Sequence, residues 1–89
     1  GTPIVSKLLT IHIGPSVLDQ LNNDRTAELG AVKGYNEGVR LCTELGDNGS
    51  RALLESILAD EEDHVDWIEG QLDQIEQMGL QNYLVEQIG

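Results

Sequence analysis

Two amphipathic stripes joined by a short turn constrain the fold of this 89-residue chain more than any other feature. Over residues 15–45, apolar side chains recur at steps of three, four or their sums, as they do on one face of a helix. A second stripe with the same spacing covers residues 48–78. The first comprises Val17, Leu21, Val32, Tyr35, Val39 and Cys42, and the second comprises Leu54, Ile57, Leu58, Val65, Ile68, Leu72 and Ile75. The sequence therefore predicts two long helices.

The stretch LGDNGS between the stripes has the composition of a tight turn between helices. Gly46 can end the first helix, and Asp47 or Asn48 can cap the second. Because the turn is so short, we expect the two helices to be antiparallel neighbours. Gly79 ends the second helix, and residues 80–88 have the spacing of a third helix that is too short to persist without packing.

The first 14 residues contain Pro3, a short apolar run and Gly14, and we expect an extended crossover there. Two amphipathic helices of roughly 30 residues can bury their stripes only partly against each other, whereas four helices can close a core. The residues alone therefore predict an all-α fold of two long antiparallel helices and a short one. This fold is half of a four-helix bundle and needs a partner.

The charge of the chain narrows the classes of partner. Sixteen acidic residues against five basic ones give a formal charge of −11, which repels phosphate backbones and anionic lipids and attracts cations. We expect no nucleic acid and no membrane among its partners. No apolar run approaches the roughly 20 residues of a spanning helix, and the first residues lack the pattern of a signal peptide. The expected location is therefore the cytoplasm.

The acidic residues that surround His64 in the sequence lie on different faces of the predicted helix. At about 100° per residue, Glu61 lies in the middle of the second apolar stripe and His64 lies at its edge. Other faces are occupied by Glu62, Asp63 and Asp66. The run therefore separates into an inward pair and an outward group.

Glu28 interrupts the apolar stripe of the first helix in the same way. An unpaired buried carboxylate is costly, and it must be compensated or protonated. A divalent metal could compensate Glu28 and Glu61, because Glu-x-x-His is the arrangement by which bundle helices present a carboxylate and an imidazole to a shared ion. The alternative is a rim histidine paired with Glu61 or Glu62, with Glu28 extended to solvent. The residues alone leave both interpretations open.

Two stretches of the chain resemble the bacterioferritin family. ILADEEDHVDWIEGQLDQIEQMGLQNYL is similar to the family's fourth helix, glycine turn and short fifth helix, and LLTIHIGPSVLDQL is similar to its crossover and the start of its third helix. The resemblance covers essentially the whole chain and implies the C-terminal half of a ferritin-like subunit, with residues 1–14 as the crossover. The family's first two helices have no counterpart here, which implies an N-terminal half as partner. Cleavage of a whole subunit near the crossover and separate encoding of its two halves would both produce such a half.

The resemblance also implies a function. Glu28 would be the carboxylate of the third helix, and Glu61 and His64 the Glu-x-x-His of the fourth, on one side of a di-iron ferroxidase centre. These three residues would be both metal ligands and catalytic residues of a centre at which oxygen or peroxide oxidises Fe(II), for storage in a 24-subunit shell, once the N-terminal half is present. The family also binds haem b at a subunit dimer interface, and the ligand of that haem belongs to the half without a counterpart. Met78 does not match that ligand.

Two other functions remain open at this point. A cage-forming or haem-carrying subunit without ferroxidase turnover would have an empty centre in iron-loaded protein. An acidic helical binding module unrelated to iron would bind no metal and form no large assembly.

Overall fold

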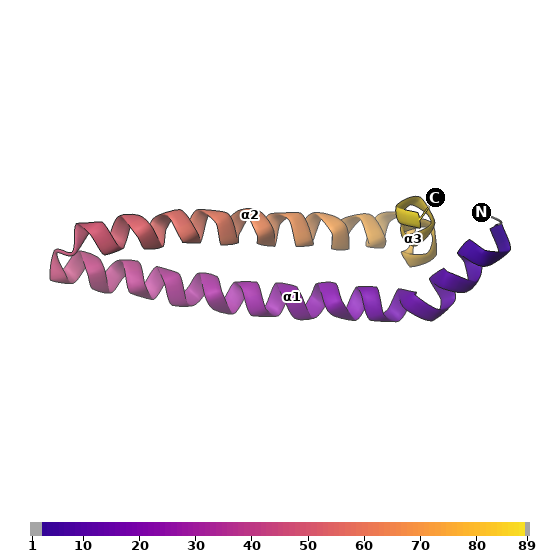
Figure 1. Cartoon of the computed structure of the whole chain (residues 1–89), viewed down its shortest axis with the longest axis horizontal. Coiled ribbons are helices and arrows are strands. Elements are labelled where there is room, and N and C mark those ends of the chain that lie inside the picture. The colour runs from indigo at the N-terminus through magenta and orange to yellow at the C-terminus, as the bar shows by residue number, and fades with distance from the viewer. Residues whose placement is uncertain (1–2, 89) are drawn as a thin grey trace. The chain divides into compact units, whose positions relative to one another are not determined.

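The structure is a computed structural model that describes the backbone of residues 3–88 and the side chains of residues 16–87. It contains three helices and no strand within these residues: α1 (Pro3–Leu45), α2 (Asn48–Met78) and α3 (Leu80–Ile88) (Figure 1). The prediction of an all-α fold with two long helices and a short one is confirmed. None of the described helices is both long and apolar enough to cross a membrane.

Glycines end both long helices, as their positions in the sequence predict. Gly46 has φ 70° and Gly79 has φ 86°, conformations that glycine adopts without strain. At the end of α1, the amides of Gly46 and Asp47 donate to the carbonyls of Thr43 and Cys42, which is the paired pattern of a Schellman motif. Oδ1 of Asp47 then accepts a hydrogen bond of 3.1 Å from the amide of Ser50. Of the two candidate caps, Asp47 is therefore the one that caps α2.

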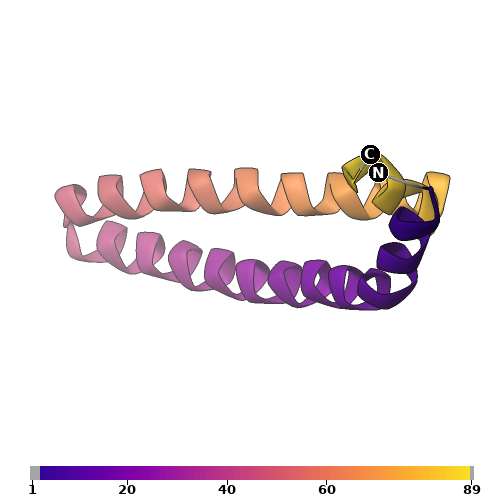
Figure 2. The same cartoon turned by 45° about the vertical axis from the view of Figure 1, so that its right-hand side comes forward.

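The expected extended crossover over residues 1–14 is wrong for residues 3–14, because α1 begins at Pro3. Proline suits the first turn of a helix. Gly14 and Pro15, which we interpreted as a break, can bend a helix without ending it. The first turns of α1, coloured indigo, are bent relative to the turns that follow (Figures 1 and 2). Gly1 and Thr2 lie outside the described residues.

Contacts within the chain divide it into two units, of which the first contains residues up to Asp24 together with those from Ile68 onward. Its buried cluster contains Leu21, Ile68, Ile75, Tyr83 and Leu84, and Ile68 is only 1% exposed. Gly79 turns α3 away from the axis of α2 (Figure 2). The hydroxyl of Tyr83 donates a hydrogen bond of 2.6 Å to Oε1 of Gln71. This contact and the apolar cluster supply the packing that the short α3 requires.

The second unit is the hairpin Arg25–Trp67, in which α1 and α2 run antiparallel. The helices approach closely at Gly38, where an added Cβ would lie 3.0 Å from Cδ1 of Leu54. Within residues 25–67, Val65 alone is buried. Large apolar side chains remain exposed in this unit, namely Leu29, Leu41, Leu45, Leu53 and Trp67. The hairpin therefore buries only part of its apolar surface.

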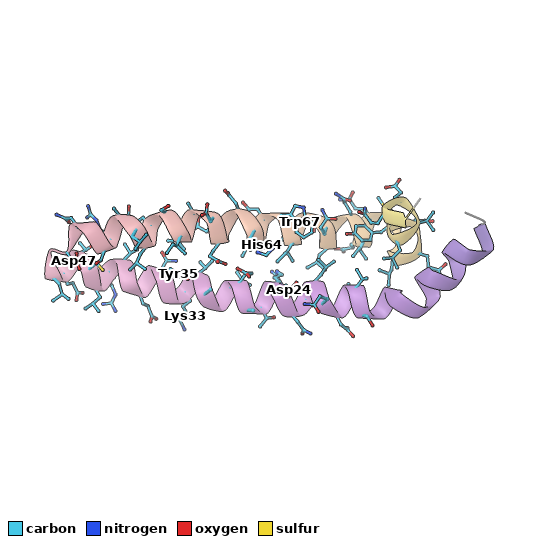
Figure 3. The ribbon with its side chains drawn as sticks, in the orientation of Figure 1. Asp24, Lys33, Tyr35, Asp47, His64 and Trp67 are labelled. Carbon is cyan, nitrogen blue, oxygen red and sulfur yellow. The ribbon has the colours of Figure 1, made fainter. Side chains whose placement is uncertain are left out.

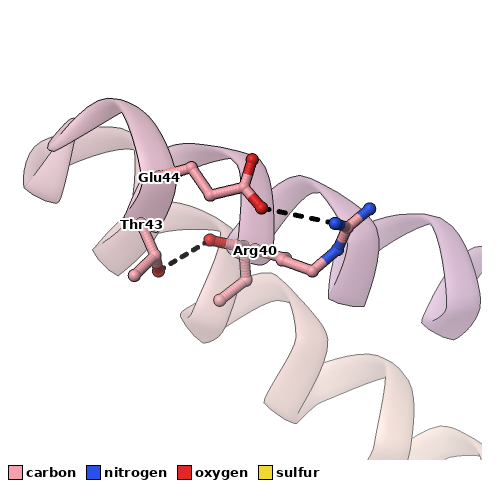
Figure 4. A network of polar contacts seen from close by, with 4 residues as sticks. Arg40, Thr43 and Glu44 are labelled. Atoms are coloured by element: carbon pink, nitrogen blue, oxygen red, sulfur yellow. Dashed lines mark hydrogen bonds and ion pairs between the residues drawn. The ribbon is translucent and has the colours of Figure 1, made fainter.

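Polar contacts near the end of α1 lie within that helix. Arg40 and Glu44 form an exposed ion pair of 3.3 Å, and the hydroxyl of Thr43 donates to the carbonyl of Val39 at 2.9 Å (Figure 4). Exposed ion pairs one turn apart contribute little to stability. These contacts support α1 itself and do not join it to α2.

Candidate metal centre

The hairpin brings together the three residues that the sequence singled out as ligands. Glu28 comes from α1, and Glu61 and His64 come from neighbouring positions one turn apart on α2. One donor atom from each residue can be chosen so that all three atoms lie within 4.8 Å of one another. His64 lies between the ribbons of α1 and α2 (Figure 3). The role of these residues as ligands stays a prediction, but their convergence is a feature of the fold.

The contact between the two helices at this point joins His64 to Glu28. Nδ1 of His64 lies 3.5 Å from Oε1 of Glu28, and their side chains are 49% and 23% exposed. This distance exceeds the usual length of a hydrogen bond, so the two groups are adjacent without being tightly bonded. A rim histidine was expected to pair with Glu61 or Glu62, whereas the contact is with Glu28. Glu28 itself is not extended into solvent.

Glu61 provides the observation that most favours a cation. Its Oε2 atom is buried and has no hydrogen-bond partner among the described residues. Leaving a buried polar group unsatisfied costs about 1–3 kcal/mol, and more when the group is charged. A cation bound between the two carboxylates and the imidazole would satisfy this oxygen. Carboxylate and imidazole are ligands that divalent first-row metals accept, so the residues fit a metal such as iron.

Trp67 contacts the site in a way that sequence analysis missed. Its indole stacks on the imidazole of His64, with ring centroids 6.2 Å apart and ring planes inclined by 28°. By the helical count, Trp67 lies off the main apolar stripe, a position that favours an interface over a ligand site. The missed signal was its spacing, because residues three positions apart on a helix are neighbours. The indole is therefore a direct neighbour of the proposed imidazole ligand.

The outward acidic residues belong to a separate feature of the hairpin. Glu62 and Asp66 line an open groove of about 210 Å³ together with Leu29, Val32 and Val65. Neither carboxylate belongs to the group formed by Glu28, Glu61 and His64. Glu61 and His64 belong to that group and Glu62 and Asp66 do not, although His64 is itself exposed.

Comparison with known proteins places this geometry in context. The profile of a family described as the ferritin-like domain matches residues 1–78. A protein named bacterial ferritin from Synechocystis sp. is 42% identical over 88 residues, which are 98% of this chain and 56% of that protein. A bacterioferritin from Streptomyces coelicolor is 38% identical over 84 residues, covering 94% of this chain and 50% of that protein.

A bacterioferritin from Brucella melitensis is 36% identical over 83 residues, which are 93% of this chain and 52% of that protein. The chain thus spans about half the length of the curated relatives that it matches. No solved structure matches the chain significantly.

Proposed function

Because the chain belongs to the ferritin-like family, we propose that it serves iron storage and contributes half of a di-iron centre at which oxygen or peroxide oxidises Fe(II). The convergence of Glu28, Glu61 and His64 carries this proposal, together with the unsatisfied oxygen of Glu61. The similarity to proteins named bacterioferritin supports it. Iron is the substrate in this proposal, and the protein supplies the groups that hold it.

The chemistry of the three side chains suits the oxidation of iron. Two carboxylates near one ion stabilise Fe(III) over Fe(II), because the attraction between opposite charges grows with the charge of the ion. The neutral imidazole of His64 adds a nitrogen ligand without further negative charge. Glu28 and Glu61 therefore lower the free energy of the oxidised ion. The indole of Trp67, stacked on the imidazole, limits the orientations that His64 can adopt.

The proposed centre is incomplete in one copy of this hairpin. A di-iron carboxylate site in a helical bundle takes a Glu from each of two helices and a Glu-x-x-His from each of the other two. This chain supplies one Glu on α1 and one Glu-x-x-His on α2. In the proposed assembly, an N-terminal helical pair supplies the rest, and the completed subunits form a 24-subunit cytoplasmic shell that carries haem at its dimer interfaces.

The test measures oxidation of Fe(II) by the chain assembled with an N-terminal helical pair from a bacterioferritin. Oxidation is monitored by the absorbance of the ferric product. We expect the rapid phase of oxidation to be lost in Glu61→Ala and in His64→Ala, while both variants still assemble. Asp63→Ala is the matched control, since Asp63 is exposed and does not belong to the ligand group. Undiminished oxidation in both ligand variants would contradict the proposal.

A further inference from the structure

Asn48 is followed by a glycine, and no other asparagine of the chain is. The side-chain carbonyl carbon of an asparagine can be attacked by the amide nitrogen of the next residue, which closes a cyclic imide. A Cβ on that next residue hinders the attack, and glycine has none. Asn48 and Gly49 are therefore the pair at which the main chain can react most readily with an asparagine side chain.

The surroundings of Gly49 leave this attack open. Asn48 and Gly49 are both exposed, and they follow Asp47 at the turn of the hairpin (Figure 3). Beyond its chain neighbours and its own helix backbone, a Cβ built on Gly49 would meet nothing closer than Oδ1 of Asp47, at 4.0 Å. The amides of Asn48 and Ser50 donate to Gly46 and Asp47, whereas the amide of Gly49 has no acceptor among the described residues. The attacking nitrogen is thus accessible and unbonded.

The other four asparagines lie inside helices and are followed by residues that have a side chain. Three of them donate from the side-chain amide to the carbonyl four residues earlier, at 2.8–3.1 Å: Asn22, Asn36 and Asn82. That bond directs the carboxamide towards the preceding turn and away from the amide that would attack it. The side chain of Asn48 makes no such bond within the described part of the chain. Asn48 therefore differs from these three in structure as well as in sequence.

Attack at Asn48 requires the first turn of α2 to open briefly, because the helical conformation holds the amide nitrogen apart from the carboxamide. Helix ends open more readily than helix interiors. Asp47 holds this turn, since its Oδ1 accepts from the amide of Ser50 and its carbonyl accepts from the amide of Arg51, each at 3.1 Å. The cap at Asp47 therefore controls how often Asn48 can react.

We propose that Asn48 is a site of spontaneous deamidation in the folded protein, with water as the co-reactant and with a rate set by opening of the capped turn. The amide nitrogen of Gly49 loses its proton and bonds to Cγ of Asn48, and the C–N bond of the carboxamide breaks to release ammonia. Water then opens the cyclic imide at one of its two carbonyls, which gives aspartate or isoaspartate. The net reaction consumes water and releases ammonia without any change of oxidation state. The inference is independent of the proposed function.

The two products affect the turn differently. Aspartate adds a negative charge in the first turn of α2, where the helix dipole favours it. Isoaspartate adds a methylene group to the main chain, which displaces Ser50 from Oδ1 of Asp47 and weakens the cap. Glu61 lies about 20 Å further along α2, at a rise of 1.5 Å per residue. The modification therefore changes the turn of the hairpin and leaves the proposed ligands in place.

The test incubates the folded protein, in its native assembly, in mildly alkaline buffer and maps its peptides by mass spectrometry. Isoaspartate is detected by enzymatic methylation. We expect Asn48 to deamidate at least about ten times faster than any other asparagine, because those lie inside helices that open less readily. Gly49→Ala is the matched variant, since a Cβ has room there. It should slow the reaction at least about fourfold, because alanine favours a helical turn over glycine.

Two variants at Asp47 test the control by the cap. Asp47→Ala and Asp47→Ser both remove the carboxylate, but only serine still caps a helix, so Asn48 should react at least about twice as fast in the alanine variant. Equal rates in the two variants would overturn the control by the capped turn. Deamidation of Asn48 in urea but not in the folded protein would overturn the site itself.

Discussion

Nδ1 of His64 on α2 lies 3.5 Å from Oε1 of Glu28 on α1. This contact joins the two long helices at the position where a buried oxygen of Glu61 has no hydrogen-bond partner among the described residues. A change at Glu28 should therefore affect both the charge of the proposed metal centre and the surroundings of the imidazole.

Replacing Glu28 by Gln should weaken metal binding. The substitution retains the size of the side chain and removes its negative charge, so we expect the affinity for Co(II) to fall by at least about tenfold, or 1.4 kcal/mol. Isothermal titration calorimetry measures the change. Glu37→Gln is the control, because Glu37 is an exposed glutamate on the same helix outside the ligand group. An equal loss in the control would indicate a general effect of net charge.

Trp67 should report on occupancy of the site by its fluorescence. It is the single tryptophan of the chain, and its indole stacks on His64. When a metal binds the imidazole, the charge and position of the ring beside the indole change. We expect a saturable change in emission on titration with Zn(II), which has no unpaired electrons to quench it. The change should be absent in His64→Ala, and an unaltered response in that variant would rule out the stack as its origin.

The hydrogen bond from Tyr83 to Gln71 should stabilise the docking of α3. Tyr83 is buried and the bond is 2.6 Å long. We expect Tyr83→Phe to lower the free energy of unfolding by about 0.5–1.5 kcal/mol in urea denaturation. A double-mutant cycle with Gln71→Ala isolates the pair, since the two effects should sum to more than the effect of the double variant. Strict additivity would mean that the bond contributes nothing.

The cap at Asp47 should make stability depend on pH in acid. The hydroxyl and the amide of Ser50 donate to the carboxylate, and these bonds hold the pKa of Asp47 below its usual value. A folded-state pKa below the unfolded-state value of about 3.9 means that the stabilisation is complete above that value. It is lost as the pH falls through the folded-state pKa.

The variant Asp47→Asn tests this dependence, because asparagine still caps a helix but does not titrate. We expect its thermal midpoint to lie below that of the wild type at pH 7. The gap should narrow as the pH is lowered through the acid range. A gap that does not change with pH would show that the charge of Asp47 does not contribute.

The sequence predicted those parts of the fold that depend on local pattern. The positions of the glycines and the helical spacing of the apolar residues predicted the ends of α2 and α3. Both signals are local, because a residue in the left-handed conformation ends a helix where it stands and the apolar period depends on residues a few positions apart. The same period placed Glu28, Glu61 and His64 on inward faces. It could not show that Pro3 begins α1, since Gly14 followed by Pro15 is compatible with both a break and a bend.

Details of the site that depend on side-chain conformation were beyond the sequence. Helical spacing makes Trp67 a neighbour of His64, but whether the rings stack depends on the rotamers of both residues. Likewise, the pattern shows that Glu61 faces inward but does not show which of its oxygens lacks a donor. Such properties arise only when two helices are placed against each other.

The unsatisfied oxygen of Glu61 makes the hairpin by itself locally frustrated. A natural sequence usually resolves conflicts of this kind, and those it retains concentrate at functional positions. An apolar residue at this position would relieve the conflict and strengthen the hairpin, at the expense of a proposed ligand. Selection for stability and selection for function therefore act in opposite directions at Glu61.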